Sequence, residues 1–400
     1  MDASANPTGG PRRGSTRRLF ELLVAAIAVG TLVGLIALWP GDVDAPVSEG
    51  LAAETERAEV ESVTYEDCPP PQTGRCGEAE VRLATGPDSD EVTTLVLGGT
   101  GLEPELEAGD EVRVARGEPA PGGPPATEPG AAVPEGPVYT LTDFERRGPI
   151  LWLALAFAAL VILFGRLRGA LSLVGLALSL AVILVFIVPA ILDGSSALAV
   201  AIVGALAIML ATVSLAHGWG AKSLAAMLGT AASLALVALL ASAFTSLAHL
   251  TGLSSEEATI LLQGGADISL EGLLLAGIVI AALGVLDDVT VSQASTVLAL
   301  RAANPGLGFG QLYVRALRVG RDHVSATVNT LVLAYVGASL PVLLIFSSGE
   351  IGLMDAVNTE LIAKEIVGTL VGSIGLIAAV PVTTALAALL ADDAEATAAD

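Results

Sequence analysis

Two adjacent carboxylates, Asp287 and Asp288, lie at the middle of a long apolar segment of the sequence. The segment runs from about Gly272 to Leu300, and as a helix it would be about 43 Å long, more than enough to cross a bilayer. Ionised groups at the centre of a membrane are costly, on the order of 2.5–3.5 kcal/mol each. An acid pair at this depth therefore needs a physical reason, and these two residues are the first candidates for chemistry.

The chemistry that suits this acid pair is proton binding. A carboxylate that is removed from water favours its neutral form, and a second carboxylate beside it favours that form further. A proton can then be held and released when a conformational change admits water, as in a proton-driven transporter. The alternative interpretation is structural: a hydrogen-bonded network that fixes helix register, or a pair that caps a broken half-helix.

The helix that carries the pair has one small and polar face. At helical spacing that face consists of Gly284, Asp288, Ser292, Ser295 and Ala299. We expect it to pack on other helices or to line a wet cavity. Asp287 lies about 100° round the helix from Asp288, so the two carboxylates need not share a partner.

Two later apolar segments supply polar neighbours for the pair. The candidate proton relay is Asp287, Asp288, Asp322, Asn329, Glu365 and Thr369, and the candidate partners are Lys364, His323, Ser292 and Ser295. Lys364 either pairs with Asp287 or extends outward to the interface. The three histidines have no metal-ligand spacing; His217 is expected in a cytoplasmic turn and His249 at an outer helix end.

The composition is that of a polytopic membrane protein, with 53% hydrophobic and 15% charged residues. The expected fold is an all-α membrane bundle of about eight transmembrane helices, with a small extracytoplasmic β-domain inserted after the first helix. The expected spans are 19–38, 149–165, 170–192, 197–216, 223–247, 272–300, 323–346 and 361–389. The expected regions are a cytoplasmic tail (1–18), a transmembrane signal anchor (19–39), the β-domain (40–148), a seven-helix membrane domain (149–390) and an acidic cytoplasmic tail (391–400).

The basic residues predict the orientation. Alternate connecting segments carry Arg166, Arg168, Lys222, Arg301, Arg315, Arg318 and Arg321. The intervening short loops, 193–196, 249–271 and 347–360, contain neither Lys nor Arg. The positive-inside rule then places both termini in the cytoplasm of a bacterium and residues 40–148 outside its cytoplasmic membrane.

The segment 41–148 holds most of the negative charge, with 24 acidic and 7 basic residues. Such acidity excludes nucleic acid as a partner. Alternating runs at 58–65, 79–83, 91–97 and 110–115 predict strands of a small barrel or sandwich, the alternative being an acidic tether with residual strands. Cys68 and Cys76 predict a disulfide rather than a shared metal site, because no histidine lies in this segment.

Longer stretches of the sequence resemble the YibE/F-like family of bacterial membrane proteins over roughly residues 139–390. They are Gly284-Val-Leu-Asp287-Asp288-Val-Thr-Val-Ser-Gln-Ala-Ser, Arg301-Ala-Ala-Asn304-Pro305, Arg318-Val-Gly-Arg-Asp322-His323, Glu365-Ile-Val-Gly-Thr-Leu-Val-Gly, Gly165-Arg-Leu-Arg-Gly169 and His217-Gly-x-x-x-Lys222. The resemblance implies a multi-pass membrane protein and does not imply a particular activity.

A shorter motif is similar to the proton relay of resistance–nodulation–division exporters. It comprises Gly284, Leu286, Asp287 and Asp288, followed by Pro381 near the end of the last span. The chain departs from an exporter half in having two more helices, an outside domain of only about 108 residues and no relay lysine at a matching depth. This resemblance implies proton coupling by the acid pair.

The sequence therefore favours a proton-coupled secondary transporter or export component. The competing hypothesis is a non-transporting membrane scaffold or sensor whose extracytoplasmic domain binds a partner. We expect neither an enzyme nor a cofactor, because no nucleophile–base pair or metal cluster is recognised. The expected partners are the lipid bilayer, protons or a small solute or ion, and either a second copy of the chain or an envelope protein.

Overall fold

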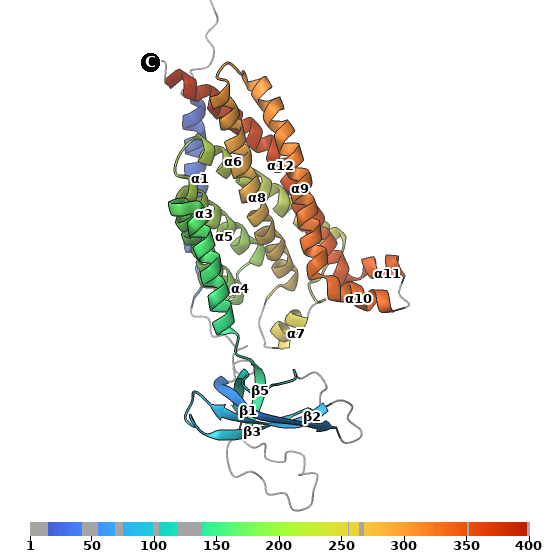
Figure 1. Cartoon of the computed structure of the whole chain (residues 1–400). Helices are drawn as coiled ribbons and strands as arrows, with labels where there is room; N and C mark the ends of the chain where they lie inside the picture. The colour runs from blue at the N-terminus through green and yellow to red at the C-terminus, as the bar shows by residue number, and fades with distance from the viewer. Residues whose placement is uncertain are drawn as a thin grey trace, which may run out of the picture. The chain divides into compact units, whose positions relative to one another are not determined.

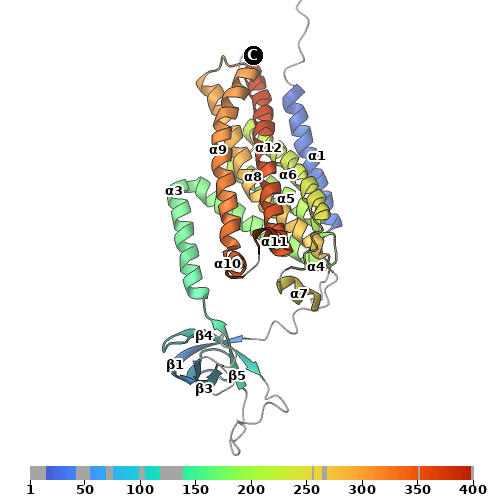
Figure 2. The same cartoon turned by 90° about the vertical axis from the view of Figure 1, so that its right-hand side faces the viewer.

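A computed structural model of the chain describes residues 15–41, 55–68, 75–98, 104–117, 138–254, 256–263, 268–349 and 352–397 (Figures 1 and 2). It divides into two units. The helical unit comprises Met1–Ala45 and Val161–Asp400, and the second unit, which contains the β-sheet, is Pro46–Leu160.

The sheet of the second unit is antiparallel and has five strands in the order β3-β2-β1-β4-β5. The strands are β1 (Thr55–Asp67), β2 (Arg75–Leu83), β3 (Val92–Leu97), β4 (Glu111–Gly117) and β5 (Val138–Phe144). The two end strands, β3 and β5, also contact each other, so the sheet curls into a half-barrel. Alternate side chains of each strand fill its core, as Ala79, Val81 and Val112 do.

Four of these strands correspond to the predicted runs, and β5 was missed. β5 follows a Pro-rich stretch and lies outside the predicted alternating runs. Its pairing with β4 and the buried ring of Tyr139 decide its place in the sheet. Tyr139 Oη donates to Asp88 Oδ2 at 2.6 Å, and burial with this carboxylate beside it raises the pKa of the phenol. Such a strand depends on contacts that are distant in sequence.

Cys68 and Cys76 are joined by a disulfide in the structure, with a Cα–Cα distance of 4.9 Å. Cys68 directly follows β1, and Cys76 lies opposite Glu66 in the adjacent strand β2. The bond therefore ties the ends of two paired strands together.

The helical unit contains α1 and every helix from the second part of α3 onward. The helices are α1 (Ser15–Ala37), α3 (Arg147–Val182, of which the part from Val161 belongs to this unit), the π-helical turn η1 (Ile183–Ile187), α4 (Val188–Leu192), α5 (Ala197–His217), α6 (Ala221–Leu247), α7 (Glu256–Gln263), α8 (Leu270–Ala303), α9 (Phe309–Ala338), α10 (Leu340–Ser348), α11 (Leu353–Asn358) and α12 (Glu360–Thr397). Within the described residues six helices are long and apolar enough to cross a membrane, or seven if α9 and α10, bent by 61°, form one span.

The predicted count of eight spans exceeds the count from the structure because the prediction divides Arg147–Leu192 into two spans. The structure joins these residues as one apolar stretch, but α3 is broken at Arg166, where φ is 51° and ψ is −131°. After the break the backbone at Gly169 lies against the carbonyl oxygen of Val161, and a Cβ at Gly169 would overlap that oxygen. Glycine therefore permits this close approach. The predicted boundary between 149–165 and 170–192 coincides with this break, and the count of eight stays a prediction.

Helix α8 lies at the centre of the helical unit and contacts α5, α6, α9 and α12. Buried polar side chains connect it to its neighbours. Thr290 Oγ1 lies 2.7 Å from Thr230 Oγ1 of α6, and Gln293 Nε2 donates to Ala316 O of α9 (3.1 Å) and to Thr384 Oγ1 of α12 (2.7 Å). These hydrogen bonds hold three helices, α6, α9 and α12, in register around α8.

Large apolar side chains cover the outside of the same unit. Phe164 is 97% exposed and Leu163 is 79% exposed, and similar residues follow the outer faces of α1, α6, α9 and α12. Apolar surface of this extent is unfavourable in water and suits contact with lipid chains. The several apolar helices thus indicate a membrane protein.

The packing of α6 against α12 gives a testable prediction about stability. A Cβ at Gly229 would overlap Thr383 Oγ1 and lie 3.0 Å from Thr383 Cβ. We expect Gly229→Ala to lower the free energy of unfolding by about 1–3 kcal/mol through overpacking. The control is Gly277→Ala on the exposed side of α8, where a Cβ would contact nothing within 4 Å. Thermal unfolding in detergent should show a lower midpoint for the first variant only; equal midpoints would contradict the contact.

Candidate functional site

The acid pair lies at the middle of α8. Asp287 is 17 residues from the first residue of the helix, Leu270, and 16 residues from the last, Ala303. The helix begins at a cap in which Ser269 Oγ accepts from Gly272 N at 3.1 Å, and it ends before Asn304. Within the described residues the pair is therefore as far from either helix end as α8 allows.

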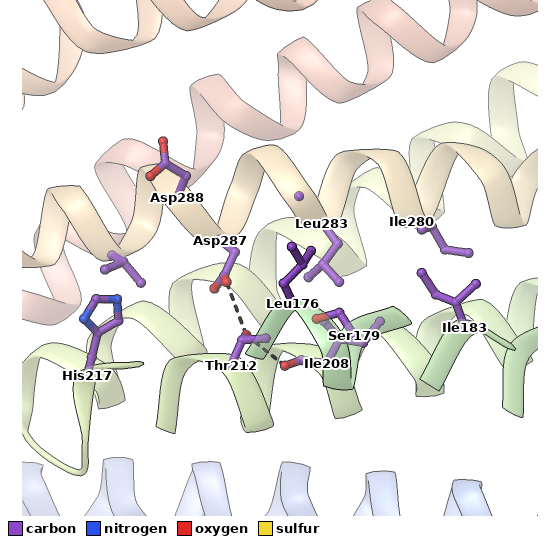
Figure 3. A pocket seen from close by; sticks show the side chains of 12 residues that line it. Leu176, Ser179, Ile183, Ile208, Thr212, His217, Ile280, Leu283, Asp287 and Asp288 are labelled. Atoms are coloured by element: carbon purple, nitrogen blue, oxygen red, sulfur yellow. Dashed lines mark hydrogen bonds between the residues drawn. The ribbon is translucent and has the colours of Figure 1, made fainter. Parts of the chain in front are cut away.

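The two carboxylates point in different directions (Figure 3). The Asp287 side chain is half-buried and points toward α5, whereas the Asp288 side chain is exposed. Their neighbours Leu286 and Val289 are 1% and 0% exposed and pack into the unit. One helical step of about 100° thus separates a carboxylate in contact with a second helix from one on an open surface.

An open cleft of about 430 Å³ adjoins both carboxylates. It is bounded by α3, η1, α5 and α8, and its lining residues are Leu176, Ser179, Ile183, Ile208, Thr212, His217, Ile280, Leu283, Gly284, Asp287, Asp288 and Val291. Of the small polar face of α8, Gly284 and Asp288 therefore line a cavity. Apart from the two carboxylates, Ser179, Thr212 and His217, the lining is apolar.

The hydrogen bonds of Asp287 are incomplete. Thr212 Oγ1 lies 3.4 Å from Asp287 Oδ2, but the same oxygen lies 2.8 Å from the carbonyl oxygen of Ile208. A threonine hydroxyl has one proton, so the shorter contact takes it and the contact with Asp287 is weak. Asp287 Oδ1 is buried and has no hydrogen-bond partner among the described residues. The carboxylate is thus largely removed from water without full compensation.

His217 was placed by the sequence in a turn, and the structure puts its ring in the cleft (Figure 3). It is the last residue of α5, and Lys222 Nζ near the start of α6 lies 3.2 Å from its Nδ1. If the ammonium group donates to Nδ1, the imidazole is neutral and carries its proton on Nε2. In the sequence His217 stands out only through the family-like motif His217-Gly-x-x-x-Lys222. Its position beside the acid pair is seen only in the fold.

The structure does not bring the predicted α9 residues to the acid pair. Asp322, His323 and Asn329 have exposed side chains. The helix packs instead through the face that carries Leu317, Gly320 and Val324. The prediction placed the polar face of α9 inward, but close helix packing favours the face with glycine and branched apolar residues.

The remaining predicted partners of the pair are also engaged elsewhere. Ser292 Oγ and Ser295 Oγ donate to the carbonyl oxygens of Val289 and Val291 within α8. These bonds satisfy the hydroxyls inside their own helix, so neither serine contacts a relay partner through them.

On α12, Glu365 and Thr369 line a separate pocket with Tyr335. Thr369 Oγ1 donates to the Glu365 carbonyl oxygen at 2.7 Å. In the part of the chain that the structure describes, no ion pair joins Lys364 to Asp287. The described ranges also contain no group of three or more His, Cys, Asp or Glu side chains that could hold a metal ion.

The segment that builds this site can be compared with known proteins. A family model described as YibE/F-like protein matches residues 153–393, which is more than half of the chain. The chain belongs to the YibE/F-like family. The match begins within α3 and includes α5, α6 and α8, so every residue that lines the cleft lies in the family region. No curated protein and no solved structure gives a significant match.

Accessibility of the cleft in this YibE/F-like protein can be tested by cysteine labelling. The only two cysteines are bonded to each other, so an introduced cysteine is the single free thiol when no reducing agent is added. We expect Asp288→Cys to react with a charged methanethiosulfonate much faster than Leu286→Cys, because the reaction needs a water-exposed thiolate that attacks the reagent. Equal labelling rates, measured by mass shift, would contradict the orientation of α8.

Proposed function

We propose that this YibE/F-like protein is a proton-coupled secondary transporter or export component in which Asp287 carries the proton. The observation that supports the proposal is the buried, unpartnered Oδ1 of Asp287 beside an open cleft that also carries Asp288. A carboxylate in this position is costly when ionised. Holding and releasing a proton is the chemistry that such a group can perform without a cofactor.

Thr212 can stabilise the neutral, protonated form of Asp287. When Asp287 is protonated, its O–H can donate to Thr212 Oγ1, because the threonine proton is directed to the Ile208 carbonyl oxygen. When Asp287 is ionised, that bond is lost and the charge faces an apolar wall. Admission of water to the cleft would stabilise the charge and release the proton.

Asp288 and His217 provide groups for the transfer between Asp287 and water. Both line the cleft, and Lys222 lies beside His217. By the positive-inside interpretation this end of the cleft faces the cytoplasm, because Arg168 and Lys222 belong to the basic connecting segments. A proton leaving Asp287 would therefore reach the cytoplasm past a basic cluster.

One wall of the cleft is suited to movement. Helix α3 has only two buried residues, Gly169 and Gly175, and it runs into the π-helical turn η1. Helices α6 and α8 each bury many more residues. Displacement of α3 against α5 and α8 would open or close the cleft at small cost in packing, whereas displacement of α8 would break its buried hydrogen bonds.

The proposal includes the expected placement in the membrane. Both termini lie in the cytoplasm of a bacterium, and the half-barrel lies outside the cytoplasmic membrane, where a disulfide is stable. The competing function, a scaffold or sensor whose half-barrel binds a partner, needs no proton transfer. The two hypotheses therefore differ in what neutralising the acid pair should do.

The experiment uses purified protein in vesicles that contain a pH dye, with an imposed membrane potential. A low-molecular-mass extract of host cells serves as the source of substrate. We expect Asp287→Asn to reduce the rate of extract-dependent proton movement by about a hundredfold. This is the lower end of the rate effect that a positioned proton-transfer group has. Asp288→Asn should have a smaller effect, and the double variant should match Asp287→Asn.

Asp322→Asn is the matched control, because it also removes an acid but has an exposed side chain on α9. It should retain the wild-type rate. The proposal is wrong if the folded double variant moves protons as the wild type does, or if the wild type shows no protein-dependent proton movement. In those cases the host phenotype of the variants and binding by the half-barrel become the measurements of interest.

A further inference from the structure

A second pocket, of about 340 Å³, lies between α9, α10, α11 and α12. It shares no lining residue with the acid-pair cleft. Its wall is apolar, with Leu343, Val357 and Leu370 as examples, and it contains one carboxylate, that of Glu365. The volume is within the range of pockets that hold small organic ligands.

The bend between α9 and α10 shapes this pocket. α9 ends at Ala338 and α10 begins at Leu340, with Pro341 in its first turn and a 61° change of direction. The pocket lies on the α12 side of this bend, and α11 contributes Val357 to its wall. A proline at the start of a helix is compatible with such a break, because its missing N–H needs no partner there.

The Glu365 carboxylate has no counter-charge in this pocket. Its side chain is half-buried, and no ion pair or side-chain hydrogen bond to its carboxylate occurs among the described residues. Lys364 precedes it on α12 but points about 100° away and does not line the pocket. The Thr369 hydroxyl is already bonded to the Glu365 carbonyl oxygen. An apolar pocket therefore presents one carboxylate without an ion-pair partner among the described residues.

Tyr335 supplies the other recognition element. It lines the same pocket from α9. The face of an aromatic ring attracts a cation, and the attraction is stronger where water is excluded. A carboxylate, an aromatic ring and apolar walls together match a ligand with one positive charge surrounded by apolar groups.

We propose that this pocket binds a hydrophobic monovalent cation, such as an amine, quaternary ammonium or phosphonium ion with apolar substituents. The cation would neutralise Glu365, and its substituents would contact the apolar wall. A lipid chain would fill the same volume but would leave the carboxylate unpaired, which charge complementarity disfavours. The proposal does not depend on proton coupling at Asp287, because the two sites use different residues.

The test is equilibrium dialysis of the full chain in a neutral detergent with radiolabelled tetraphenylphosphonium. The neutral probe triphenylphosphine oxide has similar aromatic substituents without the charge. We expect the wild type and the Asp322→Asn control to bind tetraphenylphosphonium, and Glu365→Gln to bind it at least about tenfold more weakly, since the ligand charge loses its partner. Glu365→Asp keeps the charge and should restore most of the affinity, which separates charge from folding.

Three results would overturn the proposal. They are the absence of tetraphenylphosphonium binding to the wild type, equal binding to folded Glu365→Gln, and binding of the neutral probe as tight as that of the cation. The last result would identify an apolar groove for a lipid chain. A Tyr335→Leu variant should weaken binding of the cation more than binding of the neutral probe if the ring acts on charge.

Discussion

The structure of the helical unit depends on the satisfaction of polar groups on α8. In an apolar surrounding each buried hydroxyl or amide needs a partner, and Thr290 and Gln293 find theirs on α6, α9 and α12. These contacts determine the rotation of α8 about its own axis. Once that rotation is set, Asp287 must point toward α5, and Asp288 must lie on the cleft.

The same constraint separates a well-packed side of the unit from a loosely packed side. Helices α6, α8 and α12 meet through small residues, and Gly229 and Gly375 touch the facing side chains so closely that a methyl group would overlap them. The α3 wall has few buried residues and is interrupted at Arg166 and at η1. A site between a rigid core and a loosely held wall can change its access to water without loss of the core contacts.

Several features of the candidate site could be predicted from the sequence, and others could not. The depth of Asp287 and Asp288 follows from their position in a long apolar run, and their angular separation follows from helix geometry. The contact partners of the two carboxylates could not be predicted from the sequence. A helix with polar residues on one face and glycine on another can pack through either face. Helix α9 packs through its glycine face, so Asp322 and Asn329 point outward. His217 entered the site because α5 ends beside α8, a contact between segments about seventy residues apart.

The sequence by itself determined the family, the apolar helices, four of the five strands and the residues that could carry a proton. These properties depend on composition, on periodicity and on motifs that are local in the chain. The tertiary structure decided which polar groups meet. It placed Asp287 beside Thr212 and His217 at the cleft, added β5 to the half-barrel and assigned Glu365 to a pocket of its own. The physical reason is that helix faces are chosen by packing and hydrogen bonding with distant segments, which spacing along one helix does not encode.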